Sequence, residues 1–181
     1  MGHIHTEPGQ FDFTIGAYIV RVQGDEVKIL LHMHRSLHKL LPLGGHIELN
    51  ETPWSAVSHE LQEEAGYALD DLYVLQPQAR MKRLTNVVVQ PQPLVIASYD
   101  SSETHNHTDM AFVFVEKNAP SLTPDDGESL DFRWLSIEEL SSLTSDDIFT
   151  NTKEIYSYIL DNCLDNWEKI GAADFSTDFR Q

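Results

Sequence analysis

The segment from Gly45 to Tyr67 constrains the fold of this chain more than any other part of it. Thr52 followed by Pro53 is typical of a helix N-cap with proline at the first helical position, and Gly66 supplies a left-handed stop. The apolar residues between them form one stripe at 3.6 residues per turn, namely Trp54, Val57, Leu61 and Ala65. The sequence therefore predicts a helix over residues 53–65 that packs one face against a core.

Three glutamates adjoin this stripe, and their placement opposes helix stability. Glu60, Glu63 and Glu64 lie within about one turn with no interleaved lysine or arginine, and each like-charge pair costs about 0.2–0.5 kcal/mol. Glu63 and Glu64 also occupy the last turn, where the helix dipole disfavours a carboxylate by about 0.3–1 kcal/mol. A divalent cation would reverse both penalties, and oxygen ligands suit Mg²⁺ or Mn²⁺. Taken alone, the three glutamates are equally compatible with a solvated acidic face.

The spacing of the whole segment favours the metal interpretation. Five residues separate Gly45 from Glu51, and seven more separate Glu51 from the run His59 to Tyr67. The segment resembles the Nudix box, G-x5-E-x7-R-E-U-x-E-E-x-G-U, in which U is a bulky apolar residue. Every fixed position matches except that His59 stands where the family has arginine, and Tyr67 occupies the final apolar position. The motif covers about an eighth of the chain, and its length makes a chance match improbable. Within the family, the sequence of the motif is most similar to that of MutT-type enzymes.

The resemblance implies an α+β fold, a Nudix-type α/β/α sandwich with a mixed β-sheet. It also implies a Mg²⁺-dependent (or Mn²⁺-dependent) hydrolase that cleaves a diphosphate linkage in a nucleoside diphosphate derivative or nucleoside triphosphate. The metal ligands implied are Glu60, Glu63, Glu64 and the Gly45 carbonyl, and the catalytic residues implied are the same glutamates with His59. Glu51 is expected to support the helix.

Two other functions are known alternatives for a chain with this resemblance. A non-catalytic Nudix-fold nucleotide-binding sensor is the alternative, although such modules usually lose box glutamates and all four remain here. An isoprenoid diphosphate isomerase of this fold would need a catalytic cysteine in the core, whereas Cys163, the only cysteine, falls in the predicted terminal helix. No downstream specificity motif is present, so a nucleoside triphosphate, a nucleotide sugar and ADP-ribose are all compatible substrates.

Candidate substrate-binding residues lie outside the predicted helix and its three glutamates. They are basic or imidazole side chains: Arg35, His46, Arg80, Arg83 and His107. Positive charge is scarce in this chain, so these groups could face a substrate phosphate. A mobile surface loop around Arg80, and a solvated loop holding His105 and His107, are the alternatives. Glu116 is a candidate for an additional metal ligand or general base.

The charge of the chain limits its partners. With 29 acidic against 12 basic side chains the formal net charge is −17, which repels nucleic-acid backbones and anionic membranes. We therefore expect a small phosphorylated substrate, neither duplex nucleic acid nor a membrane as partner, and leave a homodimer open. With one cysteine no intrachain disulfide can form. The sequence shows no N-terminal signal and no apolar run of membrane-spanning length, so we expect a cytoplasmic protein.

The remaining elements fit one domain over residues 11–170, between a flexible N-terminal tail (1–10) and a C-terminal tail (171–181). Strands are expected at 13–22 and 27–34, joined as a hairpin, and at 71–77, 110–117 and 132–136. Prolines confine the segment 87–100 to an edge or a broken pair of strands. Ser136 and Glu139 form a capping box that opens a short helix. A final helix is expected over residues 152–169.

Overall fold

A mixed β-sheet forms the centre of the computed structural model, which describes residues 6–102 and 105–178. Within these residues the sheet has nine strands, with the bounds β1 Phe11–Gln23, β2 Glu26–His34, β3 Lys39–Leu41, β4 Leu43–His46, β5 Leu72–Gln76, β6 Val95–Ser102, β7 His105–Glu116, β8 Phe132–Leu135 and β9 Glu168–Gly171. The strands run in the order β3-β2-β1-β7-β5-β9, while β4 pairs with β1, β6 with β7 and β8 with β2.

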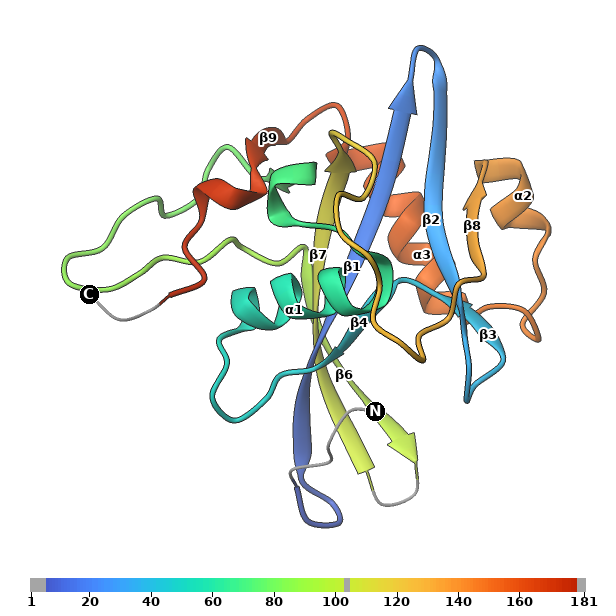
Figure 1. Cartoon of the computed structure of the whole chain (residues 1–181), viewed down its shortest axis with the longest axis horizontal. Helices are drawn as coiled ribbons and strands as arrows, with labels where there is room; N and C mark the ends of the chain where they lie inside the picture. Colours follow the sequence, from blue (N-terminus) through green and yellow to red (C-terminus); the bar gives the residue numbers. More distant parts are fainter. Residues whose placement is uncertain (1–5, 103–104, 179–181) are drawn as a thin grey trace.

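The long strands β1 and β7 lie parallel at the middle of the sheet, and each pairs with two different partners on its outer side. One end of β1 pairs with β2 in the expected hairpin, and the other end pairs with β4. In the same way β7 pairs with β5 at one end and with β6 at the other. Figure 1 shows the resulting shape, in which β6 and the first halves of β1 and β7 extend below the helices.

Helices cover both faces of this sheet. They are α1 Pro53–Ala65, α2 Ile137–Ser142 and α3 Thr150–Tyr158, with short helical turns at Leu69–Asp71, Ile159–Cys163 and Ala172–Asp174. In Figure 1 α1 lies in front of the sheet and α3 behind it, so the layers are those of an α/β/α sandwich, as predicted. In the part of the chain described, no helix has both the length and the apolarity needed to cross a membrane.

Each face of the sheet carries its own apolar core. Side chains alternate along a strand, so Ile15, Ala17 and Ile19 of β1 pack with α1, whereas Tyr18 and Val20 pack on the α3 side. The predicted stripe of α1 is confirmed as buried, with Trp54 0% exposed and its ring centroid 5.7 Å and 5.9 Å from those of two phenylalanines of β7. This packing fixes the face that α1 turns toward β4.

The ends of α1 also follow the sequence prediction. The Thr52 side chain accepts a hydrogen bond from the Ser55 backbone N–H, and Ser55 bonds back to Thr52. Gly66 adopts a left-handed conformation with φ 69° and donates its N–H to the Gln62 carbonyl. The last turn contains no basic residue, so the dipole of α1 and its glutamates stay uncompensated within the helix.

The prediction of a terminal helix over residues 152–169 is wrong at its C-terminal end. The helix continues past Tyr158 only as a π-helical turn to Cys163, in which Leu164 donates to the Ile159 carbonyl. Residues 168–171 form β9, which pairs with β5 because backbone pairing at the sheet edge outweighs local helix propensity. The chain then stays packed beyond residue 170, since Phe175 lies against Trp54.

Candidate active site

Gly45 and Glu60 meet where β4 faces α1. Gly45 pairs with Ile15, whose side chain belongs to the core on the α1 side. A Cβ added to Gly45 would overlap the Glu60 carboxylate, so that carboxylate lies directly on the backbone of β4. Glycine at this position therefore permits the close approach, and the Gly45 backbone and the Glu60 oxygens share one small space.

Glu64 is buried behind Glu60, with 8% of its surface exposed. Its Oε2 accepts a hydrogen bond from the Gly44 N–H at 2.7 Å, and its Oε1 lies 3.7 Å from His32 Nε2. Burial raises the pKa of Glu64 well above its ordinary value, and the Gly44 N–H opposes that rise. The strand that presents Gly45 thus also anchors the last glutamate of α1.

His59 joins two of the box glutamates. Its Nε2 lies 3.0 Å from Glu63 Oε2, and its Nδ1 lies 3.1 Å from Glu51 Oε1. The other oxygen of Glu51 accepts from the Glu48 N–H at 3.2 Å. The imidazole therefore fixes Glu63 against the loop before α1, with one ring nitrogen for each carboxylate. Glu51 contributes to this support, as the sequence predicted.

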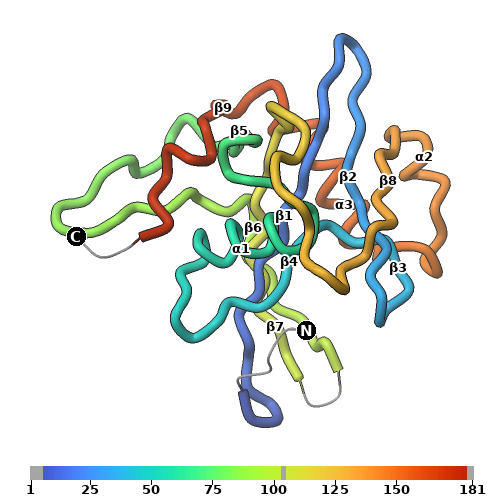
Figure 2. Tube along the Cα trace, in the orientation of Figure 1, coloured from blue at the N-terminus to red at the C-terminus, as the bar shows by residue number. Residues whose placement is uncertain are grey.

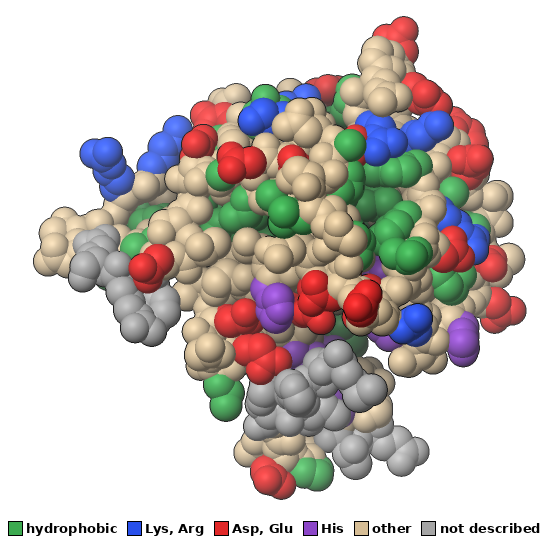
Figure 3. Space-filling view, in the orientation of Figure 1, with side chains coloured by type: hydrophobic (Ala, Val, Ile, Leu, Met, Phe, Trp, Pro, Cys, Tyr) green, Lys and Arg blue, Asp and Glu red, His purple; other side chains and the backbone are tan. Residues whose placement is uncertain are grey.

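Burial and neighbouring charge both raise the pKa of Glu60. Burial is the main cause of a rise in the pKa of Glu60 to about 7, and the neighbouring Glu63 adds to it. Figure 3 shows acidic side chains and a histidine gathered at the centre of this face, over the position of α1 in Figure 1. With no cation present, carboxyl groups at such a site hold protons at a pH where exposed glutamates are ionised.

An acidic residue outside the box, Glu128, also acts on this group. Its charge raises the pKa of both Glu60 and Glu64. The loop that carries it docks on the end of α1, where Asp125 N–H donates to the Glu63 carbonyl at 2.8 Å. Sequence reasoning missed Glu128, because nothing in its spacing marks it.

Glu116, which the sequence suggested as an additional metal ligand or general base, is bonded to other residues of the protein. It forms a two-pronged ion pair with Arg21 and accepts a hydrogen bond from the Tyr67 hydroxyl at 2.6 Å. Its side chain is 8% exposed. The structure therefore gives Glu116 a role in holding β1, β7 and the end of α1 together.

The group formed by Gly45, Glu60, Glu63 and Glu64 fits a divalent cation. Its donors are oxygens only, as Mg²⁺ and Mn²⁺ prefer, and the glycine leaves room for the Glu60 carboxylate against β4. Burial raises the pKa of both Glu60 and Glu64, and the neighbouring carboxylates add to the rise. A cation would favour the ionised form of both side chains.

The predicted basic residues divide between two places. Arg35 Nη1 lies 3.9 Å from the point where a Cβ of Gly127 would stand, so it borders the loop that carries Glu128. Arg80 instead pairs with Glu168 of β9 at 2.6 Å, and Arg83 is exposed in the loop 77–94. That loop runs beside the C-terminal segment (Figure 2). Of the three arginines, only Arg35 borders a loop whose charge acts on the glutamates of α1.

His46 and His107 lie together, but on the other face of the sheet. His46 pairs with Thr14, one residue from the Gly45–Ile15 pair, so its side chain points away from α1. His105 and His107 belong to β7, and the alternative of a solvated loop is therefore wrong. Burial, with the neighbouring histidines, lowers the pKa of His107 to about 4.

The fold and the glutamate site agree with a known family. A family model described as the NUDIX domain matches residues 12–159, more than half of the chain, and the chain therefore belongs to the Nudix family. It is a Nudix hydrolase, the enzyme class that the box implied. A search of curated proteins found no match.

Solved structures resemble it over most of their length. A Nudix-family hydrolase from Clostridium perfringens is 30% identical with a TM-score of 0.65, and the match covers 84% of this chain and 97% of that one. An Ap4A hydrolase from C. elegans is 14% identical with a TM-score of 0.61, covering 84% and 98%. The Nudix domain of NrtR from Shewanella oneidensis, solved with ADP ribose, is 12% identical with a TM-score of 0.58, covering 84% and 88%.

Proposed function

We propose that this protein hydrolyses a diphosphate linkage in a nucleoside diphosphate derivative or nucleoside triphosphate, with Mg²⁺ or Mn²⁺ as cofactor. The observation that carries this proposal is the Glu60 carboxylate packed on Gly45, with Glu63 and Glu64 beside it in the same turn. A fully solvated acidic patch would not need a glycine to admit a half-buried carboxylate. Family membership supplies the reaction class.

The proposed roles follow from the contacts of each residue. Glu60, Glu63 and Glu64 hold the cation, together with the Gly45 carbonyl. His59 is a positioning residue, because its two nitrogens fix Glu63 against Glu51. When bound, the cation neutralises charge on the diphosphate and lowers the pKa of water.

A carboxylate must also accept the proton of the attacking water. Glu60, Glu64 and Glu128 are the groups placed to do so, since each lies in the same cluster of mutually repelling charges. Arg35, which borders the loop that carries Glu128, is proposed to contact a substrate phosphate, as its guanidinium can bond two phosphate oxygens at once. Arg80 is already paired with Glu168 and is not part of this proposal.

The test is a substrate panel. Metal-stripped protein is incubated with ADP-ribose, Ap4A, a nucleotide sugar and nucleoside triphosphates, with and without Mg²⁺ or Mn²⁺, and the products are separated by chromatography. We expect hydrolysis of at least one compound only with metal, and a loss of about 100-fold or more in Glu63→Gln. Glu154→Gln is the matched control, because Glu154 is an exposed helical glutamate on α3.

Two results would contradict this proposal. Equal turnover by Glu63→Gln and Glu154→Gln would make the α1 carboxylates structural only. Tight binding of a nucleotide with no turnover of any compound would favour the alternative, a non-catalytic nucleotide sensor. Isothermal calorimetry on the same panel distinguishes that case from a missing substrate.

A further inference from the structure

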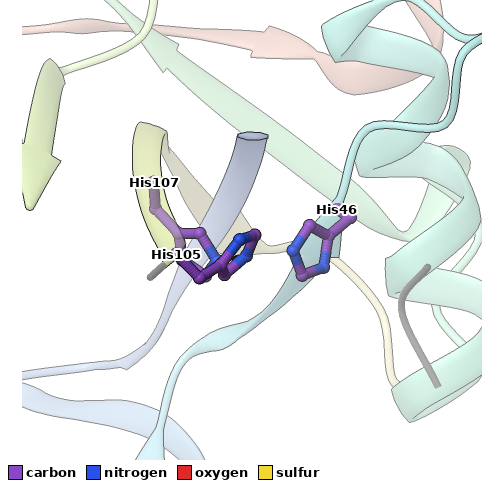
Figure 4. Close-up of side chains that lie close together, drawn as sticks. All are labelled: His46, His105 and His107. Carbon is purple, nitrogen blue, oxygen red and sulfur yellow. Dashed lines mark hydrogen bonds between the residues drawn. The ribbon is translucent and has the colours of Figure 1, made fainter. Parts of the chain in front are cut away.

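Three histidines converge at the lower end of the sheet, on the face opposite α1. This histidine cluster consists of His46 at the end of β4 and His105 and His107 near the start of β7. One ring nitrogen from each lies within 4.8 Å of the others. Figure 4 shows the three rings directed toward one another, His46 from β4 and the other two from β7.

Strand pairing explains why these residues meet. His107 pairs with Asp12 of β1, and His46 pairs with Thr14 two residues along the same strand. His105 is two residues from His107, so it shares that face. Register alone therefore places the three histidines and Asp12 on one side of the sheet.

The spacing of the donor atoms is that of a metal site. The Nε2 atoms of His105 and His107 are 2.9 Å apart, and the Oδ2 of Asp12 lies 3.4 Å from His105 Nε2 and 3.9 Å from His46 Nε2. Ligands at about 2.0–2.1 Å around a tetrahedral zinc lie about 3.3–3.4 Å from one another. The three separations given above lie within about 0.6 Å of that spacing, and no two of the ligand nitrogens, one from each ring, are more than 4.8 Å apart.

Asp12 supplies the second observation. It is 4% exposed, and its Oδ2 has no hydrogen-bond donor among the residues that the structure describes. A buried carboxylate oxygen without a donor costs free energy. Since this atom is aimed at the histidine cluster, a cation among the four groups would satisfy it.

The outer nitrogen of His107 also has the partner that a metal ligand needs. Its Nδ1 lies 3.3 Å from the Tyr99 hydroxyl on the neighbouring strand β6. Histidines that bind metal through one nitrogen use the other in such a hydrogen bond, which sets the ring orientation. The Nε2 lone pair of His107 is thereby turned into the cluster.

We propose that the histidine cluster, with Asp12, is a binding site for a divalent transition metal of the zinc class. Imidazole nitrogens with one carboxylate suit Zn²⁺, Co²⁺ or Ni²⁺ and do not suit Mg²⁺. The ion would tie together β1, β4 and β7 below the helices. This site is separate from the glutamates of α1, and it does not depend on the proposed function.

Zinc retention tests the proposal. Metal-stripped protein is incubated with Zn²⁺ in excess Mg²⁺, which occupies the glutamates, then desalted and assayed by elemental mass spectrometry. We expect about one retained zinc per chain. His105→Ala/His107→Ala should retain about tenfold less. His38→Asn, at an exposed histidine outside the cluster, and Glu63→Gln should both match the wild type.

Three results would overturn the proposal: no zinc retained by the wild type, equal retention by the double variant, or loss of zinc from Glu63→Gln alone. Circular dichroism checks that each variant is folded. If the double variant unfolds, Asp12→Asn and His107→Gln replace it in the retention assay. Co²⁺ binding to the wild type then tests whether the site exists. A tetrahedral nitrogen-rich site gives intense visible absorption with Co²⁺, and its absence would exclude the site.

Discussion

The glutamate site of α1 and the histidine cluster are neighbours in the chain and opposites in construction. Gly45 belongs to the first and His46 to the second, on opposite faces of β4. Every box residue of the first site comes from one continuous segment of the sequence, whereas the second, together with Asp12, draws on β1, β4 and β7. A contiguous site leaves a spacing pattern that can be read, and a site assembled by strand pairing does not.

Burial acts on both sites in the same way despite their opposite charges. It raises the pKa of Glu60 to about 7 and lowers the pKa of His107 to about 4. In each case the neutral form of the side chain is favoured. Both sites therefore keep groups with lone pairs close together without the full repulsion that their charged forms would generate.

The largest expected effect tests this shared role of burial through Glu60. Because its folded pKa is raised from 4.5 to about 7, the stability it contributes is present below about pH 4.5 and is lost as the pH rises through about 7. Glu60→Gln avoids that loss. Its advantage over the wild type in free energy of unfolding, measured by denaturant melts in chelator, should grow over this range by on the order of 3 kcal/mol.

The comparison with wild type is needed because His32 and His107, whose pKa values are lowered to about 4, change stability with the opposite sign. Their contributions cancel in the difference between the two proteins. Glu154→Gln serves as the exposed control and should show no such trend. A pH-independent difference for Glu60→Gln would mean that Glu60 is not desolvated in the metal-free protein.

The next effect concerns the contact between β4 and α1. In Gly45→Ala the new Cβ would occupy the position of the Glu60 carboxylate, so we expect turnover to fall about 30-fold, close to 2 kcal/mol. The fold should survive, because the displaced atoms end a flexible side chain. Steady-state kinetics and a thermal melt measure the two outcomes on the substrate identified by the panel.

A double variant sharpens this test. If Gly45→Ala acts by displacing Glu60, its effect should largely vanish in a Glu60→Gln background, since contacting residues are not additive. Full additivity would instead show that the glycine acts independently of that carboxylate.

The smallest effect concerns His59, which is half exposed at 49% of its side chain. His59→Ala removes the link between Glu63 and Glu51, and a supporting residue of this kind is worth about tenfold in turnover. His59→Arg should keep the activity and extend it to alkaline pH, because arginine stays charged. A pH–rate profile of the three proteins measures this. An inactive but folded His59→Arg would give the imidazole a role beyond positioning.

Local signals predicted α1 and its site well. The cap at Thr52, the stop at Gly66 and the stripe through Trp54 act over a few residues, and the structure reproduces them. The β1–β2 hairpin follows from the same kind of evidence. Where the interactions that determine an element span only one or two turns of the chain, composition and spacing are sufficient to predict that element.

Features that depend on distant pairing could not be predicted in this way. Polar residues at the start of β7, such as Asn106 and Thr108, lack a strand pattern. They adopt a strand conformation because β1 and β6 pair with them on both sides. Residue 168 onward becomes β9 for the same reason. Glu128 reaches the glutamates only because its loop docks on α1.

Side chains alternate between the two faces of β4 with a period of two residues, so both sites constrain the length of this strand. One peptide bond separates the backbone under the Glu60 carboxylate from the ring that faces Asp12. Inserting or deleting a single residue before Gly45 would exchange the faces, directing an imidazole at α1 and a bare backbone at the histidines. Loops of this chain can change in length during divergence, but β4 can change only in steps that preserve its phase.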